Sequence, residues 1–178
     1  MKDVNKAVCG IKLYIISNIT GQSDPTDLKA LLWAIDQLGS SRWGDETNPN
    51  LEVSVSGLAT TTSESKCNYF VAAAYIEGAG VQFLTTLSWK LKTIPIRAND
   101  LASCGACGHF VLTPKDVCIS DITSIISFSK NGDSGHTSLA LGDNLLIYHG
   151  GGGRAKVGTF EENWEQHNHG QYTRRVYR

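Results

Sequence analysis

The stretch GHTSLALGDNLLIYHG, residues 135–150, decides the fold. Two runs rich in apolar residues flank the tripeptide Gly142-Asp143-Asn144, and these three residue types are the ones that tight β-turns favour. The stretch therefore predicts a β-hairpin. If its turn consists of the two residues Asp143 and Asn144, then Gly142 pairs with Leu145 and the register of the two strands follows.

This register has a consequence for two histidines. It places Ser138 opposite His149, and side chains alternate between the two faces of a sheet. We therefore expect His136 and His149 on one face, as diagonal neighbours about 7 Å apart at the backbone. Two such imidazoles could serve as a general base and the group that orients it. A three-residue turn would instead separate them onto opposite faces, and each histidine alone is equally compatible with a structural role.

The rest of the chain supplies helices first and strands later. Residues 24–38 and 67–78 carry apolar side chains at helical spacing. Gly39 follows the first run, and Gly78 ends the second. Strands are expected at residues 122–128, 135–141, 145–149, 154–157 and 172–177. This order predicts an α+β fold in which helices pack on an antiparallel sheet. We expect one domain over residues 1–178, with an irregular cysteine-containing insertion at about 100–119.

Length and charge narrow the functional classes. The 178 residues include 16 basic and 17 acidic side chains, for a net charge of −1. With nearly equal numbers of basic and acidic side chains, the protein lacks the positive electrostatic field that nucleic-acid binding requires. No run approaches the ~18 apolar residues of a membrane-spanning helix. We therefore expect neither a nucleic-acid partner nor membrane insertion. We also expect the protein to be a monomer.

Cys67 is the first residue of the predicted helix at 67–78. The start of a helix presents unpaired N–H groups and the positive end of the helix dipole, and both favour the thiolate that acts as a nucleophile. A cysteine on the core-facing side of a helix is also often a small buried hydrophobe, so the helix alone leaves both roles open. The chain has five cysteines, so at least one cannot pair within it.

Several segments, taken in order, resemble the NlpC family of papain-like cell-wall peptidases. Residues 66–71, KCNYFV, are similar to the family's nucleophile motif at the cysteine and at the Phe-Val pair. Residues 135–137, GHT, are similar to its Gly-His-Val hairpin. Further similar segments are residues 94–97, 120–122, 148–150 and 174–176, together with Trp164. The sequence departs from the motif at Lys66, where the family has an acidic residue, and at Asn68 and Tyr69, where it has a small pair.

The resemblance implies a papain-like, NlpC-type cysteine hydrolase that cleaves an amide bond in a peptidoglycan stem peptide, with no cofactor and no metal. Cys67 would be the nucleophile, His136 the general base and acid, and His149 the group that orients His136. Backbone N–H groups at the helix start would hold the oxyanion. The substrate-binding residues would be Asn68, Tyr69 and Ser138.

The first twenty residues bear on where such an enzyme acts. The apolar run at 7–16 is interrupted by Lys12, and no small-residue cleavage site follows it, so we expect no signal peptide. A wall hydrolase without a leader resembles the amidase toxins of type VI secretion systems. Such toxins are made in the cytoplasm, act in the periplasm of a competitor and are neutralised by a cognate immunity protein. A phage-type cell-wall lysis enzyme is the alternative.

The cysteine-containing insertion allows other interpretations. Cys107 is a rival nucleophile, but Pro114 would break the helix that should follow it. Cys104, Cys107 and Cys118 together with His109 could bind zinc, which would make the protein a non-catalytic binding module. In an oxidising periplasm, Cys118 could instead form a disulfide with Cys104 or Cys107, and we expect the disulfide rather than zinc.

Overall fold

A computed structural model describes the chain at residues 10–11, 25–40, 67–81, 83–87, 92–95, 98–103, 110–112, 122–129, 135–150, 154–167 and 171–177. The predicted helix at 67–78 and the hairpin at 135–150 lie within these ranges. Cys9, Cys104, Cys107, His109 and Cys118 lie outside them, so the expected disulfide, the zinc alternative and the rival nucleophile stay predictions.

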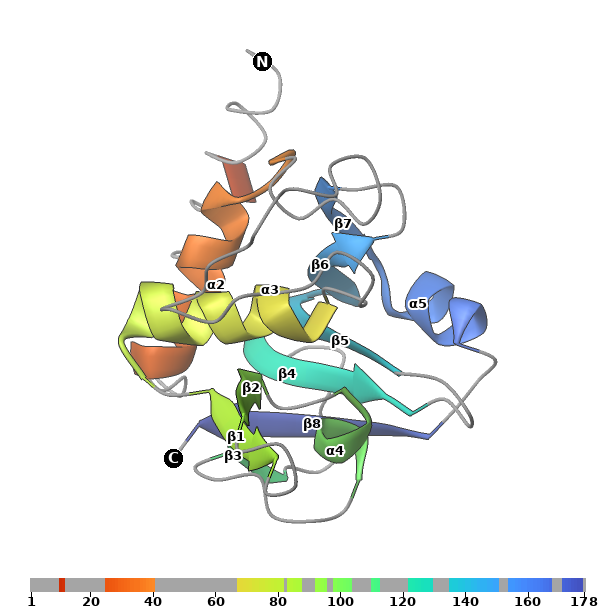
Figure 1. Ribbon diagram of the computed structural model, residues 1–178. Coiled ribbons are helices and arrows are strands. Elements are labelled where there is room, and N and C mark those ends of the chain that lie inside the picture. The colour runs from red at the N-terminus through yellow and green to blue at the C-terminus, as the bar shows by residue number, and fades with distance from the viewer. Residues whose placement is uncertain are drawn as a thin grey trace.

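A six-stranded antiparallel sheet lies at the centre of the described residues (Figure 1). Its strand order is β3-β8-β4-β5-β6-β7, so the last strand in the sequence lies between two earlier ones. The strands are β3 (Phe110–Leu112), β4 (Ile122–Phe128), β5 (His136–Gly142), β6 (Leu145–Gly150), β7 (Arg154–Thr159) and β8 (Tyr172–Tyr177). Two further strands, β1 (Leu84–Leu87) and β2 (Lys92–Pro95), pair with each other in a second sheet.

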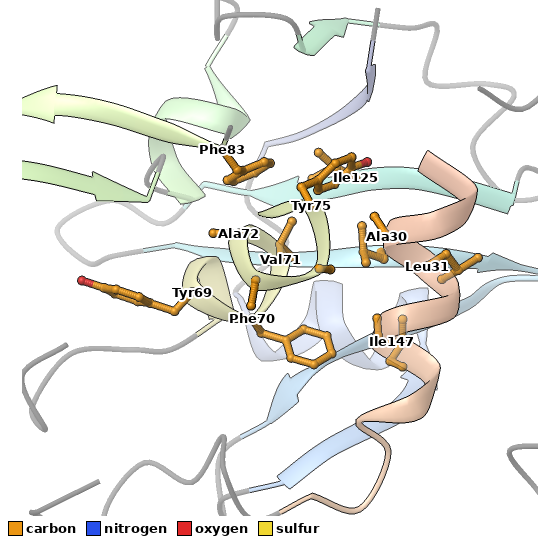
Figure 2. Close-up of a cluster of buried hydrophobic side chains, with 14 of the residues drawn as sticks. Ala30, Leu31, Tyr69, Phe70, Val71, Ala72, Tyr75, Phe83, Ile125 and Ile147 are labelled. Carbon is orange, nitrogen blue, oxygen red and sulfur yellow. The ribbon is translucent and has the colours of Figure 1, made fainter. Parts of the chain in front are cut away.

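Helices cover the sheet, which confirms the predicted α+β class. They are α2 (Pro25–Asp36), α3 (Cys67–Ala73), a π-helical turn η2 (Ala74–Gly78), α4 (Ala98–Ala102) and α5 (Phe160–Gln166). On one face, α2 and α3 bury side chains such as Leu31 and Phe70 against Leu139 and Ile147 of the sheet (Figure 2). We call this side the α3 face.

The opposite side, which we call the α5 face, carries a second and smaller core. There Phe160 of α5 packs with Phe128, Leu146 and Tyr148 of the sheet. The two cores follow from the alternation of side chains along β4, β5 and β6, because successive residues point to opposite faces. A side chain's position along its strand therefore shows which core it joins.

The helix at 67–78 forms as predicted, although its second half is a π-helical turn. Three consecutive alanines, Ala72 to Ala74, favour helix here. Gly78 lies so close to α2 that an added Cβ would stand 2.5 Å from the Cβ of Trp33. Gly80 adopts a φ of 72°, a backbone conformation that ordinary side chains resist, and the helical run ends just before it.

The predicted hairpin is present, but its predicted register is wrong beyond the turn. Asp143 and Asn144 both have positive φ, as a two-residue type I′ turn requires, and Gly142 pairs with Leu145 as expected. The ladder then shifts by one residue, because Ala140 pairs with Leu146. Leu141 is the extra residue of this β-bulge, and it moves every later pair out of the predicted register.

Two segments in and next to the insertion predicted at about 100–119 form regular elements. Residues 98–102 form the short helix α4, and residues 110–112 form β3, which pairs with β8 at the sheet edge. Arg175 joins the two, donating to the carbonyl oxygens of Leu101 at 2.8 Å, Phe110 at 3.0 Å and Ser103 at 2.7 Å.

A carboxylate links the helices to β8. Asp27 of α2 is buried, and it accepts hydrogen bonds from the Tyr75 hydroxyl at 2.5 Å and from the Tyr177 backbone N–H at 3.1 Å. A buried charge is tolerated where such donors surround it. The Asp27 contacts therefore hold α2, η2 and β8 in one arrangement around the α3-face core.

Candidate active site

Cys67 is the first residue of a helical run that continues through Gly78. Its side chain is buried, and it is present as a thiol. Helix α3 contacts β5 and β6, the two strands that carry the candidate histidines. The backbone N–H groups at this helix start have no partners within the helix, and such groups favour a thiolate or an oxyanion.

His149 lies on the α3 face of the sheet. It follows Ile147 by two residues on β6, so the two side chains share a face, and Ile147 belongs to the α3-face core. The residue directly across from His149 on β7 is Ala155, which belongs to the same core. His149 is buried. Its imidazole is therefore on the side of the sheet that carries the Cys67 helix.

His136 lies on the α5 face. Its ring stacks on His167 at 4.7 Å between centroids, with 11° between the planes, and meets Tyr148 edge-on at 5.2 Å. Phe128, its cross-strand partner on β4, is 6.4 Å away between centroids. Burial lowers the pKa of His136 to about 3, and the charges of His167, His149 and Lys156 act in the same direction.

The expectation that His136 and His149 share a face is therefore wrong. The shift at Leu141 changes the cross-strand partner of every residue nearer the start of β5. Continued beyond Leu139 and Ile147, the observed register brings Thr137, not Ser138, opposite His149. The imidazoles still influence one another electrostatically, because His149 contributes to the lowered pKa of His136.

The predicted substrate-binding residues fall in two places. Asn68 and Tyr69 follow Cys67 in α3, where Asn68 is half-buried and Tyr69 is buried. Figure 2 shows the Tyr69 ring directed away from α2. Ser138 is fully buried on the α5 face, and its hydroxyl donates to the Ile126 carbonyl oxygen at 3.3 Å. The structure thus brings Asn68 and Tyr69 together with Cys67 but places Ser138 on the other side of the sheet.

The sequence analysis missed a row of hydroxyl groups on the α3 face. Ser127 on β4 pairs in register with Thr137 on β5 and with Thr173 on β8. The hydroxyls of Ser127 and Thr137 are 2.9 Å apart, and the Thr173 hydroxyl donates to the Leu101 carbonyl oxygen at 2.5 Å. Polar residues inside otherwise apolar strands were the available signal, but the register was needed to align them.

Two features are absent from the residues that the structure describes. Among them, no three His, Cys, Asp or Glu side chains are grouped closely enough to hold a metal ion. Within the same residues, no helix has both the length and the apolar character needed to span a bilayer.

Comparisons with known proteins add one structural likeness. No family model and no curated protein matches the chain. The chain is similar to a crystal structure of the P60 domain of an antigen from M. avium subspecies paratuberculosis, with 18% sequence identity and a TM-score of 0.44. The match covers 75% of this chain and 85% of that one.

Proposed function

We propose that the protein is a cysteine peptidase or amidase of the NlpC type that cleaves an amide bond in a peptidoglycan stem peptide. The observation that carries this proposal is the placement of Cys67 at the start of a helix that packs on the strand bearing His149. The similarity of residues 66–71 and 135–137 to the NlpC motifs supports the choice of substrate.

In the mechanism that we propose, His149 rather than His136 is the general base. His149 takes the proton of the Cys67 thiol, and the sulfur attacks the carbonyl carbon of the scissile amide. Backbone N–H groups at the start of α3 stabilise the oxyanion of the tetrahedral intermediate. The protonated His149 then gives its proton to the leaving amine as the C–N bond breaks. Water activated by His149 hydrolyses the resulting thioester and restores the thiol.

His136 has a structural role in this proposal. It points away from the α3 face, is stacked between aromatic rings of the second core, and has a pKa of about 3. An effective general base has a pKa near the pH at which the enzyme works. The Gly-His resemblance assigns the base to His136, so the two assignments make opposite predictions for single variants.

The test is digestion of purified peptidoglycan, with mass spectrometry of the released fragments. Cys67→Ala should abolish product formation, and His149→Ala should reduce it by at least roughly 100-fold. His136→Phe, which preserves the aromatic packing, should retain most of the activity. If Cys67→Ala keeps substantial activity, the proposed function is wrong. If His136→Phe is inactive while folded and His149→Ala is active, then His136 is the base.

The setting we propose is that of an antibacterial toxin acting as a monomer in the periplasm of a target cell. Expression in the cytoplasm of a bacterial host should be harmless, whereas fusion to a signal peptide should cause lysis. The matched control is the Cys67→Ala fusion, which should be exported without lysis. Coexpression of a cognate periplasmic immunity protein should rescue the host. A host that grows normally with folded wild-type protein in its periplasm would contradict this role.

A further inference from the structure

Three hydroxyl side chains form a row on the α3 face of the sheet, although their neighbours along the strands on this face are apolar. Ser127, Thr137 and Thr173 are all buried and occupy neighbouring register positions on β4, β5 and β8. The next residues along the strands on this face include Ile125 and Leu139, which belong to the apolar core. A buried hydroxyl costs stability unless its hydrogen and oxygen find partners.

The row leads to His149 at one end. On β5 and β6 the observed pairs are Ala140 with Leu146 and Leu139 with Ile147. Continued by two residues along both strands, the same register brings Thr137 opposite His149. Residues directly across an antiparallel ladder have Cβ atoms about 5 Å apart, which places a threonine hydroxyl within reach of an imidazole.

The other end of the row determines its direction. The Thr173 hydroxyl donates its hydrogen to the Leu101 carbonyl oxygen, so toward Ser127, its neighbour in register, the Thr173 oxygen can act only as an acceptor. If Ser127 directs its hydrogen toward Thr173, then Thr137 is the donor in the 2.9 Å contact with Ser127. The Thr137 oxygen is then an acceptor on its remaining side, toward β6.

We propose that Thr137 is a positioning residue for His149, accepting a ring N–H so that the other ring nitrogen faces Cys67, with Ser127 holding the Thr137 hydroxyl in place. The inference rests on the proposed function for its catalytic meaning. In this proposal a threonine–serine pair orients the catalytic histidine, a role that the sequence analysis gave to a second histidine. A hydroxyl that accepts the N–H also stabilises the protonated imidazole, which must form when Cys67 loses its proton.

The experiment is an NMR titration of the His149 ring combined with the pH dependence of Cys67 alkylation by iodoacetamide. Thr137→Val removes the hydroxyl with little change of shape. It should lower the measured pKa of His149 by about half a unit to one unit and slow alkylation at neutral pH roughly three- to tenfold. Thr137→Ser should restore both. The proposal couples His149 to the Cys67 thiol, and His149 is electrostatically coupled to His136, so the titration is repeated in Cys67→Ser and His136→Phe backgrounds.

Ser138→Ala is the matched control, because it removes a buried hydroxyl from the same strand as Thr137 but on the α5 face, outside the row. It should lower stability without moving the His149 titration or the alkylation profile. If Thr137→Val behaves as Ser138→Ala does, the hydroxyl is only structural and the inference is wrong. Neither measurement needs turnover, so a wild-type protein that fails to cleave peptidoglycan would contradict the proposed function without deciding the role of Thr137.

Discussion

His136 and His149 belong to adjacent strands of one hairpin, yet their side chains project from opposite faces of the sheet. The single extra residue at Leu141 produces this arrangement, because a shift of one residue exchanges the faces of all side chains beyond it. The sequence analysis assigned both histidines to one catalytic site, but the structure places them on different faces. His149 is available to the Cys67 helix, and His136 becomes part of the second core.

The first prediction concerns acid stability. The ordinary histidine pKa is 6.5 and burial lowers that of His136 to about 3, so below pH 6.5 the unfolded chain binds a proton that the folded protein refuses. Stability should therefore fall as the pH drops from 6.5 toward 3, by up to about 1.4 kcal/mol per pH unit from this residue. Above pH 6.5 the contribution of His136 should not change.

Urea unfolding between pH 4 and 8 measures this effect. Other groups titrate in the same range, so the informative quantity is the difference between the wild type and variants that cannot titrate at position 136. His136→Phe and His136→Gln should differ from one another at pH 7, yet both should show a shallower loss of stability in acid. Curves that stay parallel to the wild type would show that His136 is protonated as easily in the folded protein as in the unfolded chain.

The second prediction tests the close packing of α2 on η2. Gly78→Ala would place a methyl group 2.5 Å from the Trp33 Cβ and 3.1 Å from the Lys29 carbonyl oxygen. The helices must move apart, so the expected loss is about 1–3 kcal/mol of unfolding free energy. Gly80→Asn is the comparison: nothing lies within 4 Å of an added Cβ there, and asparagine tolerates the positive φ. A Gly78→Ala variant as stable as Gly80→Asn would contradict the packing.

The third prediction concerns Arg175, which is almost fully buried and donates to three carbonyl oxygens that differ in direction. A lysine ammonium is a single point and cannot reproduce the planar spread of a guanidinium. Arg175→Lys should therefore cost about 2–4 kcal/mol, although it conserves the charge. Arg154→Lys, at an exposed position, should cost almost nothing, so equal losses at the two sites would rule out this explanation.

The fourth prediction concerns the start of α5. The Thr159 hydroxyl accepts from the Glu162 N–H at 3.2 Å, and the Glu162 carboxylate accepts from the Thr159 N–H at 2.9 Å. Thr159→Ala removes one half of this capping box and should cost about 1 kcal/mol. Thr159→Ser should keep the cap and most of the stability. Trp164 reports on α5 by fluorescence, and an unchanged unfolding midpoint in Thr159→Ala would contradict the role of the cap.

The sequence predicted what depends on local patterns. Apolar spacing located α2 and the helix that begins at Cys67, and the turn residues Asp143 and Asn144 located the hairpin. These features depend on a few neighbouring residues, so they can be read without the rest of the chain. The β-bulge at Leu141 does not follow from the apolar pattern, because Leu141 resembles its strand neighbours. Gly142, whose φ is 86°, adjoins the bulge, but a glycine beside a turn does not by itself show that the ladder shifts.

The sequence predicted which residues belong to the candidate site, but not which of them lie together in the structure. Cys67 and the two histidines stand out because of their chemistry, but the faces of the histidines depend on a register that one residue can alter. The Ser127–Thr137 pair escaped notice for the same reason. Its members are ten positions apart in the sequence and become neighbours only when β4 and β5 pair.

The position of β8 has a consequence for how the protein is made. The strand at Tyr172–Tyr177 forms the contact between β3 and β4, so the sheet has a gap until these residues have left the ribosome. During synthesis, β3 and β4 expose edges with unpaired N–H and carbonyl groups, which can pair with other chains. Until β8 has been made, these edges are the places where the nascent chain is most open to aggregation.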